Sequence, residues 1–487
     1  MLDDLISASS DVNTLEEFIS DHFDELRDYF AWSTDQDLEL NINKFQTYIT
    51  KKRKTLLELP LTEENLSFLA VLLDTCERLG LIHGFRFLYL HLQTNGYNVG
   101  SRLTAASYYM INVRSGDLLI DAFDQMYELL QESYLNEEDN ADKVLTTITN
   151  YYSKAILDFG NFNIQVAQEI AKKISLRIKT NEYSVLAHPL IFEILKTDLS
   201  DFRVAHLHIR SLLDQYLRRG HFKGTVKEGF IIESATQYAN ELEQVEKDFF
   251  AIRQLSVDKH NTLGNQGIFD SLHRGVRIPE QEPQLFAYMT GFGPMHRQKL
   301  VSAFIELPLQ LYTKKINIID WGCGQAMGTM CFLDYCNENH IDLEIETVVL
   351  IEPSTIALQR GALHVKKYLD CNIVTVNKGL DDLSEDDIEV GAGVNIHLFS
   401  NILDIEFFSL NRLISLIKSG YGGKNYFMVV SPYIDDAKKF RINRFVKSFS
   451  ELKGFKVYSD ITQAKYEWRN SWTRISRVFS VDLNFKI

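Results

Sequence analysis

INIIDWGCGQ, residues 316–325, is the stretch of sequence that decides the fold of the C-terminal half. A short apolar run ends at Asp320, and glycines follow at positions 322 and 324. Glycines at the end of a first strand let the backbone pass close to a ligand. Further apolar runs alternate with helical patterns, at TVVLIE (347–352), NIVTV (372–376), VNIHLFS (394–400) and YFMVVS (426–431). This alternation predicts buried parallel strands in an α/β sheet.

The sequence on either side of these runs bounds the sheet. FKVYSDI (455–461) and TRISRVFSVDL (473–483) have strand patterns with no long helix between them, which predicts an antiparallel pair at the sheet edge. Two prolines in IPEQEP (278–283) mark a domain boundary. Residues 284–308 then predict a short helix, a turn at Gly291–Pro294 and a second helix.

Residues 1–277 predict an all-α domain, because apolar residues recur there at spacings of three and four. Thr14 with Glu17 has the pattern of a capping box. Thr62 is expected to begin a helix that ends at Gly80.

The helical domain is either a repeat array or an irregular bundle. Two of its units share a tyrosine pair, a glycine and an alanine at an offset of 43 to 45 residues: Tyr108–Tyr109, Gly116 and Ala122, then Tyr151–Tyr152, Gly160 and Ala167. Small residues at helix crossings are what stacked helical hairpins need. Two copies also fit a bundle. Residues 226–255 predict one long helix that joins the halves.

Charge is distributed unevenly along the 487 residues. The net charge of −15 argues against a protein that coats nucleic acid through bulk charge. Residues 431–487 nevertheless carry 12 Lys and Arg against 6 Asp and Glu, whereas residues 1–300 stand at −13. An RNA substrate read locally at the C-terminal end therefore stays open beside a protein substrate. The acidic helical domain is expected to meet a protein partner.

Cysteine usage and hydropathy predict a cytoplasmic protein. The five cysteines form no Cys-x-x-Cys pair, which favours a reducing compartment and disfavours a metal site. No uncharged apolar run reaches about 18 residues, so no membrane span is expected. The first residues lack the basic and apolar regions of a signal peptide.

The motif at the end of the first strand resembles that of class I S-adenosylmethionine-dependent methyltransferases. In that family the first strand ends in Asp/Glu-x-Gly-x-Gly and the second in an acidic residue, matched here by Asp320, Gly322, Gly324 and Glu352. The resemblance covers residues 316–487 and implies a Rossmann-like domain with S-adenosylmethionine as its cofactor. It implies that the two glycines line the amino-acid part of the cofactor, that Asp320 lies beneath it and that Glu352 binds its ribose.

The same resemblance assigns residues at other strand ends. An acidic residue after the third strand often meets the adenine amino group, and Asp381 or Asp382 occupies that place. The end of the fourth strand supplies groups near the cofactor and catalytic groups, which implies a cofactor contact for Ser400 and catalytic roles for Asn401 and Asp404.

The segment GFGPMHR (291–297) precedes the first strand. In this family the helix at that place often closes over the methionine end of the cofactor. His296 is then a candidate general base, and Arg297 or Lys299 a partner for the cofactor carboxylate. The alternative is a turn between domains that carries solvated charges.

Two departures from the family pattern keep a second function open. Ala326 replaces the third glycine, and Ser-Asn-Ile-Leu (400–403) stands where amino-methylating enzymes carry a Pro-Pro-aromatic tetrapeptide. The candidates are methyl transfer to RNA or protein selected by the helical domain, and a non-catalytic scaffold, assembly factor or sensor. A nicotinamide or flavin site is disfavoured, because Met327 holds the third position of Gly-x-Gly-x-x-Gly.

Aromatic and basic residues near the strands have both structural and functional interpretations. Trp321 either packs in the core or forms a wall of the cofactor pocket, and His397 is expected to pack within the sheet. A basic cluster with interleaved phenylalanines follows the fifth strand, at Lys438, Lys439, Arg441, Arg444 and Lys447. It predicts either a rim for an acidic substrate or an amphipathic helix with a solvated basic face.

Overall fold

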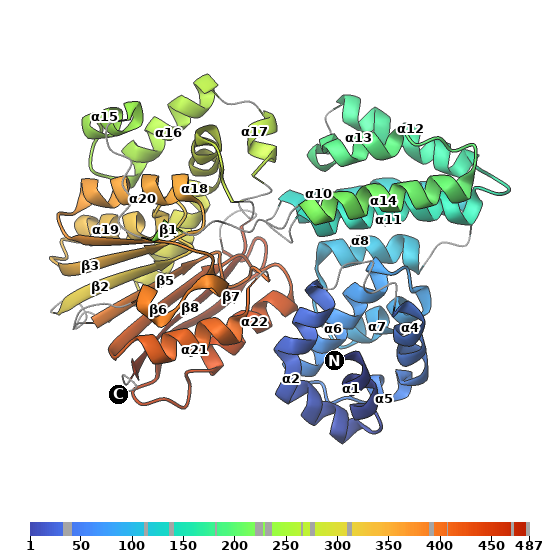
Figure 1. Cartoon of the computed structure of the whole chain (residues 1–487), viewed down its shortest axis with the longest axis horizontal. Helices are drawn as coiled ribbons and strands as arrows, with labels where there is room; N and C mark the ends of the chain where they lie inside the picture. The colour runs from blue at the N-terminus through green and yellow to red at the C-terminus, as the bar shows by residue number, and fades with distance from the viewer. Residues whose placement is uncertain are drawn as a thin grey trace. The chain divides into compact units, whose positions relative to one another are not determined.

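The computed structural model describes residues 1–32, 41–111, 115–135, 141–180, 183–219, 227–228, 236–263, 266–272, 278–308, 314–388, 394–406, 408–468 and 472–483. The chain forms two compact units, whose elements are labelled in Figure 1. The first comprises residues 1–222 with Ile434–Phe440, and the second comprises residues 223–433 with 441–487. None of the described helices is both long and apolar enough to cross a bilayer.

The described part of the first unit is helical, as the sequence predicts. Its helices are α1 (Leu2–Ala8), α2 (Val12–Trp32), α4 (Ile42–Lys51), α5 (Arg53–Leu57), α6 (Glu63–Arg78), α7 (Ile82–Thr94), α8 (Gly100–Met110), α9 (Gly116–Asp121), α10 (Phe123–Leu135), α11 (Ala141–Phe159), α12 (Gln165–Thr180), η1 (Ser184–Ala187), α13 (Pro189–Leu195) and α14 (Phe202–Arg219). Their apolar faces share one buried core, which accounts for the spacing of three and four.

Helix ends in this unit follow local capping chemistry. The Thr62 side chain accepts a hydrogen bond from the Asn65 N–H, and Gly80 has a φ of +67° after the last turn of α6, as predicted. The predicted cap at Thr14 is wrong. The Asp11 carboxylate instead accepts from the Thr14 N–H at 3.0 Å, so α2 begins one residue after that aspartate.

The two similar tyrosine units contact each other. The rings of Tyr109 and Tyr151 meet edge to face with centroids 5.8 Å apart, and both are buried. A Cβ added at Gly116 would lie 2.4 Å from Val166, and one at Gly160 only 2.3 Å from Phe202. These glycines therefore permit close approach of neighbouring segments.

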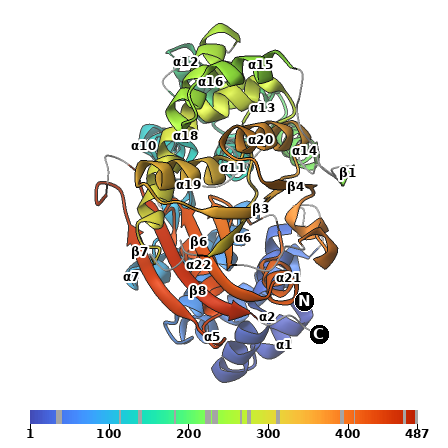
Figure 2. The same ribbon diagram turned by 90° about the vertical axis from the view of Figure 1, so that its left-hand side faces the viewer.

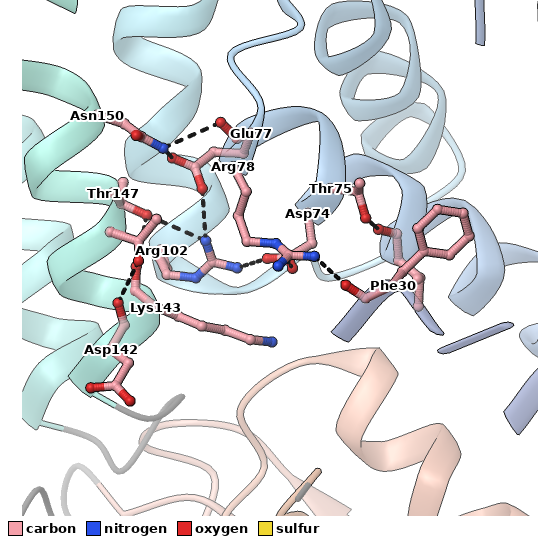
Figure 3. A network of polar contacts seen from close by, with 12 residues as sticks. Phe30, Asp74, Thr75, Glu77, Arg78, Arg102, Asp142, Lys143, Thr147 and Asn150 are labelled. Carbon is pink, nitrogen blue, oxygen red and sulfur yellow. Dashed lines mark hydrogen bonds and ion pairs between the residues drawn. The ribbon is translucent and has the colours of Figure 1, made fainter. Parts of the chain in front are cut away.

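A buried charged network joins α6, α8 and α11 (Figure 3). Arg102 contacts Glu77 at 3.3 Å and pairs with Asp74. Glu77 is fully buried and also accepts hydrogen bonds from the Tyr109 hydroxyl at 2.5 Å and the Asn150 amide at 3.2 Å. Burial raises the pKa of Glu77, and the Arg102 guanidinium opposes that rise.

The second unit contains one mixed sheet with its helices. In chain order the elements are β1 (Lys227–Glu228), α15 (Gln237–Gln244), α16 (Phe249–Leu263), α17 (Gln266–Asp270), α18 (Glu282–Phe304), β2 (Lys315–Trp321), α19 (Met327–Glu338), β3 (Glu344–Ile351), α20 (Thr355–Tyr368), β4 (Asn372–Asn377), η4 (Leu380–Asp382), η5 (Glu385–Asp387), β5 (Val394–Ser400), α21 (Leu410–Gly420), β6 (Gly423–Ser431), α22 (Asp436–Lys447), β7 (Lys456–Gln463) and β8 (Arg474–Leu483). The start of α22, up to Phe440, belongs to the first unit.

The strands lie in the order β1-β4-β3-β2-β5-β6-β8-β7. Strands β4, β3, β2, β5 and β6 are parallel, and β8 pairs antiparallel with both β6 and β7. Figure 2 shows β7 and β8 side by side at one edge. The predicted parallel sheet with an antiparallel C-terminal edge is therefore confirmed. The short strand β1, antiparallel to β4, has no counterpart in the sequence analysis.

Helices cover both faces of the sheet (Figure 1). Ile318 and Leu350 point to the face that packs with α16, α18, α19 and α20. Their neighbours Ile319 and Ile351 point to the face that packs with α21 and α22. Because successive strand residues face opposite sides, strands covered on both faces read as continuous apolar runs, which is why these strands are visible in the sequence.

The single helix predicted over residues 226–255 is wrong. The described part of that stretch contains β1, α15 and the start of α16, and Val245 is extended at the end of α15. A new helix, α16, begins after Asp248, because the Asp248 carboxylate accepts hydrogen bonds from the N–H groups of Phe250 and Ala251 and caps the helix. Both α15 and α16 lie in the second unit, which begins before the prolines at residues 278–283.

The turn predicted at Gly291–Pro294 is also wrong, because α18 runs through it. A Cβ added at Gly291 would lie 2.3 Å from the ring of Phe269, so this glycine serves close packing. Pro294 has no N–H for the carbonyl of Thr290 one turn earlier. Arg253 donates to that carbonyl at 2.8 Å and replaces the missing bond.

Candidate functional site

The loop after β2 adopts a conformation that glycine favours. Gly322 and Gly324 have φ angles of +61° and +53°. A Cβ added at Gly322 would lie 2.6 Å from Ile402, whereas one at Gly324 would meet no described atom within 4 Å. The backbone at Gly324 therefore faces open space at the carboxyl end of the sheet. Ala326 also has a positive φ of 58° and opens α19.

Asp320 holds this loop to the helix that follows it. Its carboxylate accepts from the Thr329 N–H at 3.0 Å and from the Thr329 hydroxyl at 2.8 Å, both in the first turn of α19. The residue is 1% exposed, and this burial raises its pKa to about 6. A Cβ added at Gly328 would lie 3.0 Å from the same carboxylate, so the residue after Met327 is also required to be small.

Glu352 meets the glycine loop from the end of β3. One carboxylate oxygen accepts from the Gly324 N–H at 3.0 Å, and the other accepts from the Ser354 N–H at 2.9 Å. Burial raises the pKa of Glu352 to about 7, and the nearby Asp320 adds to the rise. A carboxylate has about four acceptor positions, so lone pairs remain for two hydroxyl donors.

Asn377, at the end of β4, supports Glu352 from behind and was not singled out in the sequence. Its amide nitrogen donates to the carbonyls of Glu352 and Pro353, both at 2.9 Å. Its oxygen accepts from the Thr355 hydroxyl at 2.7 Å. The polar residue that ends this apolar strand was the only signal in the sequence.

His296, Ser400 and Asn401 lie together, although the histidine is more than a hundred residues from the other two. His296 Nδ1 lies 3.2 Å from the Ser400 hydroxyl, and Asn401 Nδ2 lies 2.9 Å from His296 Nε2. Since the amide nitrogen donates, Nε2 accepts, and the neutral ring carries its proton on Nδ1. Burial lowers the pKa of His296 to about 3, and the Lys299 charge adds to the shift.

This cluster includes a left-handed backbone position. Asn401 follows β5 with a φ of +55°, a region that non-glycine residues rarely adopt. Its N–H continues the sheet by donating to the Val430 carbonyl at 2.8 Å. The left-handed turn directly after the strand aims the Asn401 amide at His296. Such conformations are concentrated at ligand and catalytic sites.

The other predicted residues lie in separate contacts. Asp404 is buried and accepts from the Ser431 hydroxyl at 2.9 Å, which joins the ends of β5 and β6. Asp381 accepts from the Ser409 N–H at 2.9 Å, just before α21. Each of these carboxylates therefore closes a loop in the described structure.

The cations predicted for the cofactor carboxylate differ in their contacts. Arg297 donates to Glu338 at 2.5 Å and lies over the Phe250 ring at 4.4 Å, so it is held within α18, α19 and α16. Lys299 is fully buried in α18. Its charge acts on His296, as the histidine pKa shows.

Trp321 and His397 pack in the sheet. Trp321 is fully buried, stacks on Phe399 at 5.6 Å and donates to His397 Nδ1 at 3.2 Å. His397 Nε2 in turn meets the Asn425 amide oxygen at 2.9 Å, and burial lowers the pKa of His397 to about 4. Trp321 packs with the face that α21 and α22 cover, so the core interpretation holds for both residues.

The basic stretch after β6 forms an amphipathic helix. Phe445 and Phe449 pack in the sheet core. Arg441 is buried rather than solvated, and its guanidinium donates to the carbonyls of Leu403 and Phe408 at 2.9 and 2.8 Å. Arg441 thus fixes the chain after Asn401, a role for which the sequence pattern gave no signal.

A second polar chain ties α18 and α20 to the loop. Gln325 donates from its side chain to the Leu285 carbonyl at 2.9 Å, and its own carbonyl accepts from His364 Nδ1, also at 2.9 Å. His364 Nε2 then accepts from the Tyr238 hydroxyl at 2.7 Å. Burial lowers the pKa of His364 to about 3, which keeps this ring neutral.

The predicted residues converge on one end of the sheet. Gly324 follows β2, Glu352 follows β3, and Asn401 follows β5. Since β2 lies between β3 and β5, this is where the strand order reverses direction. Open α/β sheets bind ligands outside the carboxyl ends of the strands at such a point. Among the described residues no cluster of His, Cys, Asp and Glu is arranged to hold a metal ion.

Comparison with known proteins gives similarity of structure only. No protein-family model and no curated protein sequence matches this chain. The plantazolicin methyltransferase BpumL in complex with SAH matches 45% of this chain and 99% of its own at 9% identity and a TM-score of 0.27. A putative class I S-adenosylmethionine-dependent methyltransferase from Listeria monocytogenes matches 75% of this chain and 90% of its own, at 10% identity and a TM-score of 0.27. An O-methyltransferase family protein from Burkholderia thailandensis matches 58% of this chain and 85% of its own, at 14% identity and a TM-score of 0.28.

At these identities and scores the assignment of the fold rests on the sheet itself. Five parallel strands in the order β4-β3-β2-β5-β6 are extended by antiparallel β8 and β7. This is the Rossmann-like α/β fold that the sequence predicts, a mostly parallel sheet with an antiparallel C-terminal edge. The open space at Gly324 and the acceptor positions left on Glu352 fit the cofactor that the sequence motif implies.

Proposed function

We propose that the second unit binds S-adenosylmethionine at the carboxyl ends of β2, β3 and β5. One observation carries this proposal. Gly324 and Glu352, 28 residues apart in the chain and both named by the sequence motif, are joined by a hydrogen bond of 3.0 Å beside open space. A loop with left-handed glycines and a carboxylate at the next strand end suits a ligand with a ribose and an amino-acid part.

In this proposal Gly322 and Gly324 line the amino-acid part of the cofactor, and Glu352 accepts from the ribose hydroxyls. Asp320 holds the loop through Thr329. S-adenosylmethionine supplies an electrophilic methyl group on a positively charged sulfur. Asp381 and Ser400 remain candidates for contacts with the adenine and with the cofactor's reacting end.

We further propose that the second unit methylates a macromolecule, RNA or protein, that the helical unit selects. Asn401 is the candidate group that orients the methyl acceptor, and Asp404 lies on the same loop. His296 serves here as a positioning residue. A ring with a pKa of about 3 is a weak base at neutral pH, but it fixes the Asn401 amide by accepting its hydrogen bond.

A non-catalytic function is the second candidate. Ser-Asn-Ile-Leu at residues 400–403 replaces the tetrapeptide that grips a target nitrogen in amino-methylating enzymes of this family. The acidic helical unit would then act as a scaffold, assembly factor or sensor toward a protein partner.

Calorimetry with S-adenosylmethionine tests the cofactor site through Gly324→Ala. This variant carries a left-handed alanine, which costs about 1–2 kcal/mol, and its methyl group enters the space assigned to the cofactor. Gly80→Ala is the matched control, because Gly80 has a φ of +67° and its added Cβ also meets nothing within 4 Å. We expect at least a tenfold loss of affinity in Gly324→Ala alone. Absence of binding to the wild-type protein refutes the proposed cofactor site and with it the proposed methyl transfer.

Transfer of a labelled methyl group to total RNA and to total protein then separates the two functions. Label that appears in one of these fractions with the wild type, and is reduced with Asn401→Ala, supports the enzyme. The labelled fraction then identifies the substrate class. Cofactor binding without label in either fraction supports the non-catalytic candidate.

A further inference from the structure

Residues of α5 and α7 in the first unit line a cavity. Its volume is about 590 Å³, within the range of about 300–1,000 Å³ typical of ligand sites. The α7 residues that line it begin at His83 and end at Thr94, at intervals of three and four that place them on one helix face. At 1.5 Å per residue this face is roughly 16 Å long, the span of about five extended residues.

The charged side chains that line the cavity are basic. Arg53 and Arg86 line it, and no Asp or Glu stands among the described residues that do. Neither arginine forms an ion pair with another described residue. Residues 1–300 as a whole stand at −13, so two arginines without acidic neighbours in the lining make a local site for an anion.

One of the two arginines is already oriented by an aromatic ring. The Arg53 guanidinium lies over the Phe87 ring at 5.3 Å. Stacking uses the flat face of the guanidinium and leaves its N–H edge for a carboxylate or phosphate. His91 contributes hydrogen bonding rather than charge at neutral pH, because burial lowers its pKa.

The rest of the lining combines apolar and polar side chains: Leu57, Phe87 and Leu90 with His83, His91, Thr94 and Asn95. Leu57, Phe87 and Leu90 flank the arginines, and Leu90 is 47% exposed. A site for a free phosphate alone would not need leucines beside the arginines on both helices. Leucines beside arginines over this length match a peptide in which acidic and large apolar side chains are mixed.

We propose that this cavity, lined from α5 and α7, binds a short acidic and apolar peptide segment of a protein partner. Carboxylates of the peptide pair with Arg53 and Arg86, and its apolar side chains cover Leu57 and Leu90. The site is separate from the proposed cofactor site and does not depend on it.

Selection of random 12-residue peptides displayed on phage, with the full chain as bait, tests the proposal. We expect the selected peptides to be rich in Asp or Glu together with Leu, Ile or Phe. By fluorescence anisotropy a labelled selected peptide should bind the Arg53→Glu/Arg86→Glu variant at least tenfold more weakly than wild type, and 0.5 M salt should weaken wild-type binding. The matched control is Lys172→Glu/Lys196→Glu, which makes the same charge change on exposed lysines of this unit and should bind within twofold of wild type.

Three results would overturn the proposal. The first is a selection without acidic enrichment, and the second is equal binding of the selected peptides to the arginine variant and to wild type. The third is saturable binding of pyrophosphate or ATP that requires both arginines, without any peptide binding, which would assign the cavity to a small phosphate ligand. Circular dichroism of both double variants checks that each is folded.

Discussion

Replacing Glu352 by glutamine is expected to remove a defined part of the pH dependence of stability. Burial raises the pKa of Glu352 to about 7 in the folded protein, against 4.5 for a free glutamate. The folded state therefore holds this proton more tightly than the unfolded state does. The stabilisation is full below pH 4.5 and is lost as the pH rises through 7. Between pH 5 and pH 8 these two values give a loss of about 2–3 kcal/mol in the free energy of unfolding.

The assay is denaturant unfolding at both pH values. It is followed by the fluorescence of Trp321, which is buried in β2, in a background whose other three tryptophans are replaced by phenylalanine. The wild type should lose about 2–3 kcal/mol more than Glu352→Gln between pH 5 and pH 8. Glu346→Gln, which removes an exposed carboxylate from the same strand, should behave as wild type. Equal pH dependence in wild type and Glu352→Gln would refute the raised pKa of this buried carboxylate.

Two further predictions concern buried polar partners. Arg253→Met should destabilise the second unit by about 1–3 kcal/mol, because the Thr290 carbonyl in α18 loses its hydrogen-bond donor. In a Pro294→Ala background the same change should cost less than half as much, because the backbone N–H of residue 294 replaces the guanidinium. A double-mutant cycle that shows no coupling between the two changes would contradict this. Arg102→Met should destabilise the first unit by about 3–5 kcal/mol in thermal unfolding, because the buried Glu77 carboxylate loses its partner. Adding Glu77→Gln should recover part of this loss, because it removes the uncompensated charge. If stability does not recover, packing and not charge causes the loss.

Much of the fold could be predicted because its signals are local. The strands from Lys315 to Ser431 are apolar runs that both faces of the sheet require, and Thr62 and Gly80 cap their helix with their own side chain and backbone. The glycines at 322 and 324 were recognisable for the same reason, since a left-handed φ is a property of single residues.

The prediction of a turn at Gly291–Pro294 failed because distant residues reversed a local preference. Gly291 and Pro294 favour a turn, yet α18 continues through them. Phe269 fills the space that a side chain at Gly291 would occupy, and Arg253 supplies the hydrogen bond that the proline cannot. The energy of these contacts comes from segments far along the chain, which a window of sequence does not contain.

In the candidate site, too, some properties follow from local sequence and others from tertiary contacts. The residue types at the ends of the strands were set by the sequence, including Asp320, Glu352 and Asn401. Their states were not: the pKa of about 7 on Glu352, and the pairing of Asn401 with a neutral His296, arise from burial and from elements that only folding brings together. The same holds for the arginine cavity of α5 and α7. Desolvation and proximity depend on every neighbour in space, and the order of residues along a chain specifies only the neighbours in sequence.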